Sequence, residues 1–263
     1  MKLLKLRKRE SKKVFNYIVK KRKSHPLHFT LIDPDKQKPK DAAKLAKLVE
    51  KLGSDAIMIG GSQAAQAIFL DDTIKAIKEV TDLPIILFPS SHAGVSRYAD
   101  AIFFHSLLNS RSAQYLIEEQ MKGSILIKSY GLETLGMAYL IVESGKMTTA
   151  EWAGDVKALP RDKPELVVGY ALTAKFYGMK LVYLEAGSGA KYSVPEKMIM
   201  MAKQAVTNGK NSNFVIVGGG IRDAKTAGGK VKAGADIVVT GTVAENNPER
   251  LKEIIEAIHK KKK

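Results

Sequence analysis

Residues 181–190 have the sequence LVYLEAGSGA, an apolar run followed by a glycine-rich turn, with the carboxylate of Glu185 just before that turn. The apolar run predicts a buried strand. Two similar units follow, FVIVGGG at 214–220 and IVVTGT at 237–242. Glycine lets backbone N–H groups approach an anion closely and adopts conformations that other residues avoid. Three such units in succession are typical of the phosphate-binding end of a (β/α)8 barrel.

Strands and helices alternate along the rest of the chain. Strands are expected at residues 27–32, 56–59, 84–88, 101–104, 137–142, 180–185, 213–217 and 236–240. Helices are expected at 9–23, 41–52, 63–80, 112–121, 165–177, 195–206, 223–233 and 248–260. This alternation implies parallel pairing with right-handed crossovers. Since eight strands favour closure, the α/β chain is expected to form one TIM barrel domain over residues 1–263.

Three segments depart from the regular pattern. The link from residue 88 to residue 101 is too short for a full crossover helix, so one helix should be reduced, while the basic helix at 9–23 is an extra N-terminal element. Residues 124–135 are expected to be irregular and residues 148–164 to be rich in turns. The alternative fold is a doubly wound open sheet. It is weakened because the first strand-to-helix turn, DPDK at 33–36, lacks a GxGxxG sequence.

Composition narrows the class of protein. The 263 residues match the usual ~250 of a (β/α)8 barrel, and the lack of cysteine excludes disulfides and thiolate metal sites. The basic N-terminus has no apolar segment of a signal peptide, and no apolar run approaches the ~20 residues of a membrane span. We therefore expect a cytoplasmic protein.

The formal net charge of +16 would suit nucleic acid, an anionic membrane surface or a polyphosphate substrate. Much of the excess lies at residues 5–23 and 259–263. No aromatic residues interleave with the C-terminal lysines, and no recognised nucleic-acid motif is present. Solvated basic ends are therefore favoured over nucleic-acid binding.

Candidate functional residues follow the strands, because active sites of barrels lie at the carboxyl ends of the strands. The glycine turns are expected to bind phosphate, although each alone could simply be a tight turn. Glu185 could be a general base or a structural ion-pair partner. Tyr183 should lie on the same inward side, where it could bond a ligand hydroxyl or fill the barrel.

A magnesium site is a further hypothesis. Asp33 and Ser62 follow the first two strands and could offer the oxygen ligands that Mg²⁺ prefers. Asp33 before Pro34 is equally typical of a turn. His92 and His105 also lie at strand ends, but no metal-ligand spacing links them.

Two apolar features have open interpretations. One face of the helix at 165–177 has small residues beside aromatics, which favours core packing but could also line an apolar groove. Trp152 is a candidate interface residue, with burial as the more ordinary explanation. The members of the helix face are Leu166, Gly169, Tyr170, Thr173 and Tyr177.

Six segments together resemble the geranylgeranylglyceryl phosphate synthase family, in its larger archaeal branch. They are TLIDPDK at 30–36, IGGS at 59–62, LFPSS at 87–91, YLEAGSG at 183–189, VGGGIR at 217–222 and TGT at 240–242. They occur in family order across nearly the whole chain. The bacterial-type branch has a lysine two positions before the first aspartate, where this chain has Leu31.

This resemblance implies a prenyltransferase that joins geranylgeranyl diphosphate to the 3-hydroxyl of sn-glycerol 1-phosphate, the first committed step of archaeal ether-lipid synthesis. Asp33 and Ser62 would hold Mg²⁺, with Lys36 as another possible diphosphate contact. Glu185, assisted by Tyr183, would take the hydroxyl proton. The glycerol phosphate site would comprise Tyr183, Leu184, Glu185, Ala186, Gly187, Ser188, Gly189, Gly219, Gly220, Gly241 and Thr242.

The resemblance also implies an apolar groove, expected along the helix at 165–177, and a homo-oligomer. A basic surface could give transient contact with an anionic membrane. Two other hypotheses stay open from the sequence. One is a barrel isomerase or lyase acting on a small sugar phosphate, which would need neither Mg²⁺ nor an apolar groove. The other is a non-catalytic binder of nucleic acid or acidic surfaces.

Overall fold

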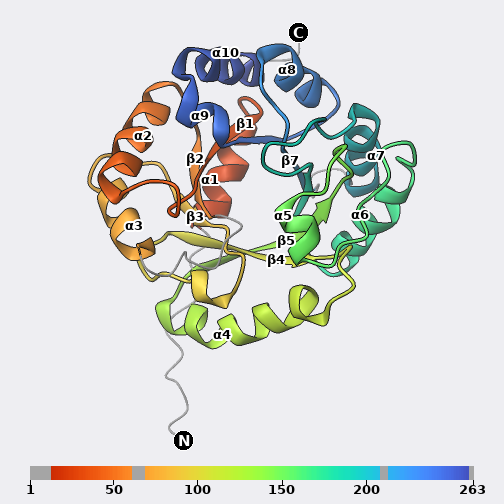
Figure 1. Cartoon of the computed structure of the whole chain (residues 1–263), viewed down its shortest axis with the longest axis horizontal. Coiled ribbons are helices and arrows are strands. Elements are labelled where there is room, and N and C mark those ends of the chain that lie inside the picture. The colour runs from red at the N-terminus through yellow and green to blue at the C-terminus, as the bar shows by residue number, and fades with distance from the viewer. Residues whose placement is uncertain (1–12, 61–68, 208–212, 261–263) are drawn as a thin grey trace, which may run out of the picture.

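The computed structural model describes residues 13–60, 69–207 and 213–260. Eight parallel strands form a closed barrel in the order β1 to β8, and helices surround it (Figure 1). The strands are β1 (Leu27–Ile32), β2 (Ala56–Ile59), β3 (Ile85–Leu87), β4 (Ala101–Leu107), β5 (Glu133–Ile141), β6 (Leu181–Glu185), β7 (Phe214–Gly218) and β8 (Ile237–Thr240). The expected (β/α)8 fold is confirmed, and the doubly wound open sheet is excluded.

The helices occupy most of the expected positions. They are α1 (Lys13–Arg22), α2 (Pro39–Lys51), α3 (Leu70–Lys78), α4 (Glu119–Tyr130), α5 (Thr149–Ala153), α6 (Leu166–Phe176), α7 (Glu196–Val206), α8 (Ala224–Lys232), α9 (Thr242–Asn246) and α10 (Pro248–His259). The first residues of the helix expected at 63–80 lie outside the described residues. The same holds for residues 9–12 of the expected N-terminal helix.

The crossover between β3 and β4 is reduced to the single 3-10 turn η2 (His92–Gly94), as expected. The irregular segment expected at 124–135 is wrong, because a π-helical turn, η3 (Gln114–Glu118), continues into α4 as far as Tyr130. Gly131 ends α4 with φ of 68°, a left-handed cap that glycine favours. Strand β5 then begins at Glu133, four residues before the expected start.

The turn-rich segment 148–164 contains the short helix α5, which begins with a capping box between Thr148 and Glu151. Trp152 on this helix is 75% exposed, so its burial in the core is excluded. Helix α9 was not expected either.

Two layers of apolar side chains make the core. Along β6, Leu181 and Tyr183 belong to the cluster inside the barrel, whereas Val182 and Leu184 belong to the cluster between strands and helices. This alternation follows from the two-residue period of a strand. It turns Tyr183 and Glu185 toward the barrel axis, as expected.

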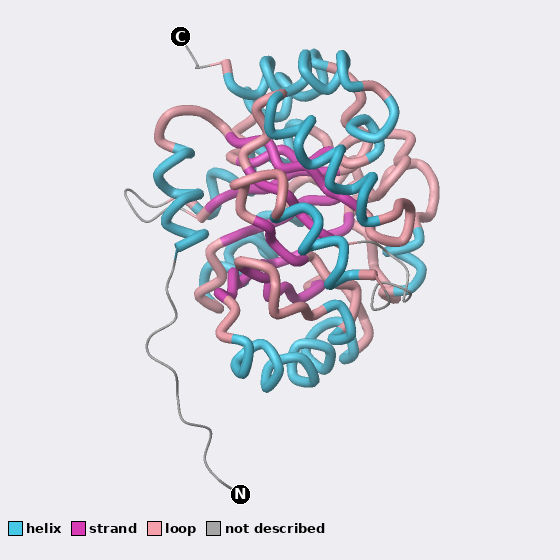
Figure 2. The backbone as a smooth tube through the Cα atoms, turned by 90° about the vertical axis from the view of Figure 1, so that its left-hand side faces the viewer, coloured by secondary structure: helices cyan, strands magenta, loops and turns pink. Residues whose placement is uncertain are grey.

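Helix α1 closes the end of the barrel at which the strands begin. Val14 and Ile18 are buried with the interior cluster, and the backbone N–H groups of Val14 and Phe15 donate to the carboxylate of Glu133 at 2.8 and 2.9 Å. Figure 2 shows this helix beside one end of the strands. Because one end is closed, a ligand can enter the barrel only from the other end.

Candidate functional site

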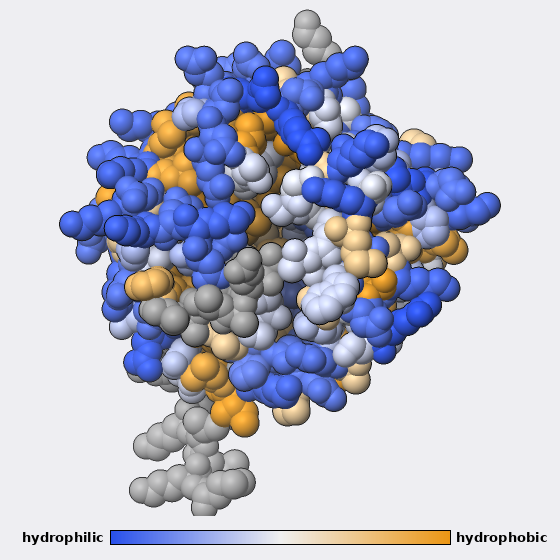
Figure 3. All heavy atoms as spheres, in the orientation of Figure 1, coloured by the Kyte–Doolittle hydropathy of each residue, from blue (hydrophilic) through white to orange (hydrophobic). Residues whose placement is uncertain are grey.

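A cavity of about 740 Å³ opens at the carboxyl ends of the strands. Figure 3 shows this face of the molecule hollowed near its centre, with residues of intermediate hydropathy beside the hollow. The cavity has two chemically different halves. The loops after β6, β7 and β8 form a polar half, and β3, β4, η3 and α4 form an apolar half.

Glu185 lies between these halves at the end of β6 and is only 8% exposed. Its Oε1 accepts the N–H of Gly187 at 2.6 Å, and the Tyr183 hydroxyl donates to its carboxylate. Burial raises the pKa of Glu185, although these two hydrogen bonds oppose the rise. A carboxylate with a raised pKa is a better proton acceptor, which suits a general base.

The glycines around Glu185 are required by space and by backbone conformation. A Cβ atom on Gly218 would lie 2.6 Å from Glu185 Oε2 and closer still to the Tyr183 hydroxyl. Gly219 and Gly220 have φ of 80° and 68°, in the left-handed region that side chains disfavour. The loops after β6 and β7 therefore pack their backbone close to the Glu185 carboxylate, where any side chain would displace it.

Aromatic rings form the wall beneath Glu185, and sequence analysis missed most of them. The ring of Tyr139 on β5 lies 5.3 Å from that of Tyr183 and 5.2 Å from that of Phe88. Burial raises the pKa of both tyrosines well above 10, so their hydroxyls stay protonated and can donate. Alternation along β5 was the signal that could have identified Tyr139, because Met137, Tyr139 and Ile141 share its inward face.

His105 belongs to the same wall, with its ring 5.1 Å from that of Phe88. Burial lowers its pKa to about 4, while a hydrogen bond to the Phe103 carbonyl opposes the shift. His105 is therefore neutral at physiological pH. It contributes shape and polarity to the wall rather than charge.

The apolar half has one charged group at its edge. Glu119 on α4 accepts the backbone N–H and the imidazole Nδ1 of His92, at 2.8 and 2.7 Å. Burial raises its pKa, but these hydrogen bonds and one from Gln114 outweigh burial and lower the pKa to about 2. This pair joins α4 to the turn η2, so it fixes the wall where the β3–β4 crossover is shortest.

Most of the expected site residues meet at this cavity. It is lined by Asp33, Tyr183, Glu185, Gly187, Ser188, Gly189, Gly219, Gly220, Gly241 and Thr242. The side chains of Leu184 and Ala186 instead pack in the outer core cluster. Ser62 lies outside the described residues. Lys36 and Arg222 also line the cavity and place positive charge at its rim.

The expected groove along the helix at 165–177 is wrong for the described part of the chain. Val167, Ala171 and Ala174 of α6 face the outer core, and the residues lining the cavity come from η3 and α4 instead. The physical reason is the reduced β3–β4 crossover. Where a full helix is missing, the space beside β3 and β4 is open, and α4 forms its far wall.

Asp33 has the chemistry of a ligand for a hard cation. Asp33 follows β1 directly, and its carboxylate lies at the cavity rim, where Oδ1 accepts the N–H of Asp35 at 3.1 Å and Oδ2 lies 3.6 Å from Lys36 Nζ. Mg²⁺ is commonly held by one or two carboxylates together with waters and substrate phosphates. One carboxylate facing an open, polar rim fits that arrangement.

Comparisons with known proteins agree with this geometry. The model of the PcrB family matches residues 16–261. The chain is 52% identical over 234 residues to geranylgeranylglyceryl phosphate synthase of Pyrococcus furiosus, covering 89% of this chain and 90% of the relative. It is 50% identical over 233 residues to the enzyme of the same name from Thermococcus gammatolerans, with the same coverage.

Solved structures give the same result. The structure of (S)-3-O-geranylgeranylglyceryl phosphate synthase from Thermoplasma acidophilum, in complex with its substrate sn-glycerol-1-phosphate, has a TM-score of 0.87 and 40% identity, covering 94% of this chain and 98% of that one. A thiamine phosphate pyrophosphorylase from Pyrococcus furiosus is 12% identical with a TM-score of 0.56, which is a likeness of fold alone. In the described residues, every helix is too short or too polar to cross a membrane.

Proposed function

The chain belongs to the PcrB family, and on this basis we propose that it transfers a geranylgeranyl group from geranylgeranyl diphosphate to the 3-hydroxyl of sn-glycerol 1-phosphate. One observation carries the proposal beyond the family relationship. Glu185, a buried carboxylate with a raised pKa, lies where a glycine-lined polar half and an apolar half of one cavity meet. Such a cavity suits a small phosphate acceptor and a long isoprenoid donor together.

The acceptor would bind in the polar half. Backbone groups of Gly219 and Gly220 can approach a phosphate closely, whereas the Gly187 N–H is donated to Glu185, and Arg222 adds positive charge. With its phosphate fixed there, the 3-hydroxyl would lie beside Glu185. Such positioning replaces a bimolecular encounter by a local one.

The reaction forms one bond and breaks another. Glu185 takes the proton of the 3-hydroxyl, whose oxygen bonds to C1 of the allylic donor. The bond from C1 to the diphosphate oxygen breaks, and the diphosphate leaves with the electron pair. The Tyr183 hydroxyl holds the carboxylate in position through its hydrogen bond, while the neighbouring aromatic faces suit the positive charge that develops at C1.

The donor would lie across the rim and the apolar half. Its isoprenoid chain would follow Phe88, Phe103 and Ile127 toward α4, and its diphosphate would meet Lys36. Asp33 is the residue that would hold Mg²⁺, with Ser62 as a further ligand expected from the family resemblance. When bound, Mg²⁺ would offset negative charge on the leaving diphosphate.

The alternative, an isomerase or lyase of a small sugar phosphate, would use only the polar half. It gives no role to the apolar wall made by β3, β4 and α4. The proposed prenyl transfer uses both halves, and the enzymes named above share 50–52% of their aligned residues with this chain.

The test is prenyl transfer from labelled geranylgeranyl diphosphate, with sn-glycerol 1-phosphate and its 3-phosphate enantiomer compared with and without Mg²⁺. We expect Mg²⁺-dependent product from the 1-phosphate alone. Product without Mg²⁺ would remove the metal from the proposal but keep the reaction. Failure of both acceptors would favour the sugar-phosphate alternative.

We further propose a homo-oligomer that contacts anionic membranes transiently. Exposed apolar residues support an interface: Ile117, Met121 and Ile125 form one stripe on η3 and α4, and Phe176 and Tyr177 lie at the end of α6. The net charge of +16 supports attraction to anionic lipid. Light scattering would reveal a monomer if the first proposal fails, and equal binding to neutral and anionic vesicles would exclude the second.

A further inference from the structure

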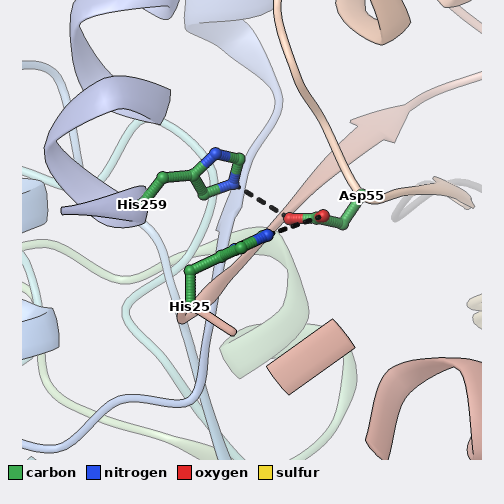
Figure 4. A group of neighbouring side chains, drawn as sticks. All are labelled: His25, Asp55 and His259. Carbon is green, nitrogen blue, oxygen red and sulfur yellow. Dashed lines mark hydrogen bonds and ion pairs between the residues drawn. The ribbon is translucent and has the colours of Figure 1, made fainter. Parts of the chain in front are cut away.

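Three side chains far apart in sequence meet at the closed end of the barrel, opposite the cavity. His25 precedes β1, Asp55 precedes β2, and His259 is the last residue of α10. Figure 4 shows both imidazoles directing a ring nitrogen at the carboxylate of Asp55. His259 Nε2 lies 3.0 Å from Oδ2 and His25 Nε2 lies 3.9 Å from Oδ1, and the two rings are 4.1 Å apart.

The hydrogen bonds of His25 determine where its lone pair points. Its Nδ1 lies 2.9 Å from the carbonyl oxygen of Pro26, which can only accept, so Nδ1 carries the hydrogen. In a neutral imidazole, Nε2 then holds an unshared pair that faces the Asp55 carboxylate. Two electron-rich atoms facing each other are stabilised by a cation close to them, which can be a proton, the ammonium of Lys21 or a metal ion. A backbone carbonyl on the outer ring nitrogen is also the usual way in which proteins orient histidine ligands of metals.

We propose that His25, Asp55 and His259 bind a divalent transition-metal ion of the Zn²⁺ class. Two imidazole nitrogens and one carboxylate oxygen are a donor set that Zn²⁺ favours, with water in the fourth position. All three ligand atoms lie within 4.8 Å of one another. Tetrahedral ligands at 2.0–2.2 Å from zinc are roughly 3.4 Å apart, so the distance from His25 Nε2 to Asp55 Oδ1 would shorten by about 0.5 Å and that from His259 Nε2 to Oδ2 would lengthen by about 0.4 Å.

The surroundings of Asp55 favour this adjustment. The carboxylate is 2% exposed, and its Oδ2 accepts the backbone N–H of His28 at 3.0 Å, which fixes its orientation. Among the described residues, the lysine close to Oδ1 is Lys21, whose Nζ lies 3.6 Å from that oxygen. Its side chain is 43% exposed and can turn to solvent when a metal ion takes its place. The histidines lie on a loop and on a helix end, where small movements disturb little packing.

A metal ion here would join the segment before the first strand to the end of the last helix. Binding restricted to the folded chain stabilises that state by mass action. At a metal concentration 100 times the Kd, the expected increase in Tm is roughly 5–10 °C for a domain of this size. The metal would not take part in prenyl transfer, because the cavity is at the other end of the barrel.

The test is titration of the metal-stripped full chain with Zn²⁺ and with Co²⁺, in excess Mg²⁺ so that hard oxygen sites are filled. We expect one equivalent to bind, a tetrahedral Co²⁺ absorption spectrum and a higher Tm. His25→Gln and His259→Gln should each weaken binding by more than roughly 10²-fold, since even loss of a residue behind the ligands can cost that much. His92→Gln is the matched control, because His92 is a histidine in another part of the fold, and it should bind like the wild type.

Both test variants should fold and retain prenyl transfer without added Zn²⁺, which separates this proposal from the proposed reaction. A featureless titration of the wild type would overturn the metal site. Equal Zn²⁺ binding by His25→Gln, His259→Gln and the wild type would also overturn it, because the metal would then bind elsewhere. In either case the three residues would be an ion-paired cluster only.

Discussion

Gly218→Ala tests whether the position of the Glu185 carboxylate sets the rate of catalysis. Gly218 ends β7 in extended backbone, which alanine also adopts, so the change adds a methyl group without backbone strain. That methyl group would lie 2.6 Å from Glu185 Oε2, whereas ordinary contacts begin at 3.4 Å. The carboxylate must therefore retreat by about 0.8 Å, the difference between these two distances.

The retreat is modest for the fold but large for the reaction. The methyl group would lie still closer to the hydroxyl of Tyr183, which is 1% exposed and must move further than the carboxylate, so we expect overpacking to lower the free energy of unfolding by about 1–3 kcal/mol. A misplacement of about 1 Å can slow a reaction roughly 10²-fold, which is about 2.7 kcal/mol of activation free energy. We expect kcat to fall by that factor, with KM for sn-glycerol 1-phosphate changed less than threefold or so.

The assay is steady-state prenyl transfer beside thermal unfolding followed by circular dichroism. Gly169→Ala in α6 is the control, because its added methyl group meets nothing within 4 Å. A helical Gly→Ala change should raise stability by about 0.5–1 kcal/mol and leave turnover unchanged. Full turnover of Gly218→Ala would refute the reasoning, since Glu185 could then move without consequence. A large fall in Tm would show instead that the methyl group disrupts the barrel.

Three further predictions follow from the site and the core. Glu185→Gln should lower turnover roughly 10²–10⁴-fold while glycerol phosphate still binds by calorimetry. Burial raises the pKa of Glu185, so the stability that its protonated form contributes is lost as pH rises through that pKa. At pH 8, Glu185→Gln should therefore unfold at the same Tm as the wild type or at a higher one. A lower Tm at pH 8 would contradict the raised pKa. Asp33→Asn should weaken the Mg²⁺ dependence of diphosphate binding, and an unchanged Mg²⁺ titration would exclude Asp33 as the ligand. Lys230 is 2% exposed and its ammonium lies 2.7 Å from Glu196 Oε1. Glu196→Gln should therefore lower the free energy of unfolding, measured by urea titration, by about 1–3 kcal/mol. An unchanged midpoint would show that the Val194 carbonyl alone satisfies Lys230.

The barrel was predictable because each strand is a short apolar run with polar or glycine residues at its ends. Strand β1 was expected at 27–32 and observed at Leu27–Ile32, and β2 agrees equally well. The length of α4 was not predictable. Ile117 on η3 and Met121 and Ile125 on α4 face solvent, so the pattern of hydrophobic residues does not indicate which face is buried.

The site was predictable where one segment supplies several residues, as between Tyr183 and Gly189. It was not predictable where it depends on register or on neighbouring elements. Tyr139 lies beside Tyr183 only because β5 and β6 pair in that register, with the two tyrosines opposite each other. The side of the barrel on which the apolar half opens depends on which crossover lacks a helix, and the cluster of His25, Asp55 and His259 spans more than 200 residues.

The closure of the barrel by α1 has a consequence for synthesis of the chain. This helix is made before all eight strands, yet two of its carboxylate partners come late: Glu133 follows Val14 by 119 residues, and Asp236, which accepts from Arg22 at 2.9 Å, follows Arg22 by 214. At 5–20 residues per second, the helix waits roughly 10–40 s for the last of them. During that interval Val14 and Ile18 lack part of their native core cluster, and the cluster of Lys20, Lys21 and Arg22 at the end of the helix opposes aggregation by charge. A helix made before every strand is thus among the last elements to dock fully, and its docking marks the completion of the nascent barrel.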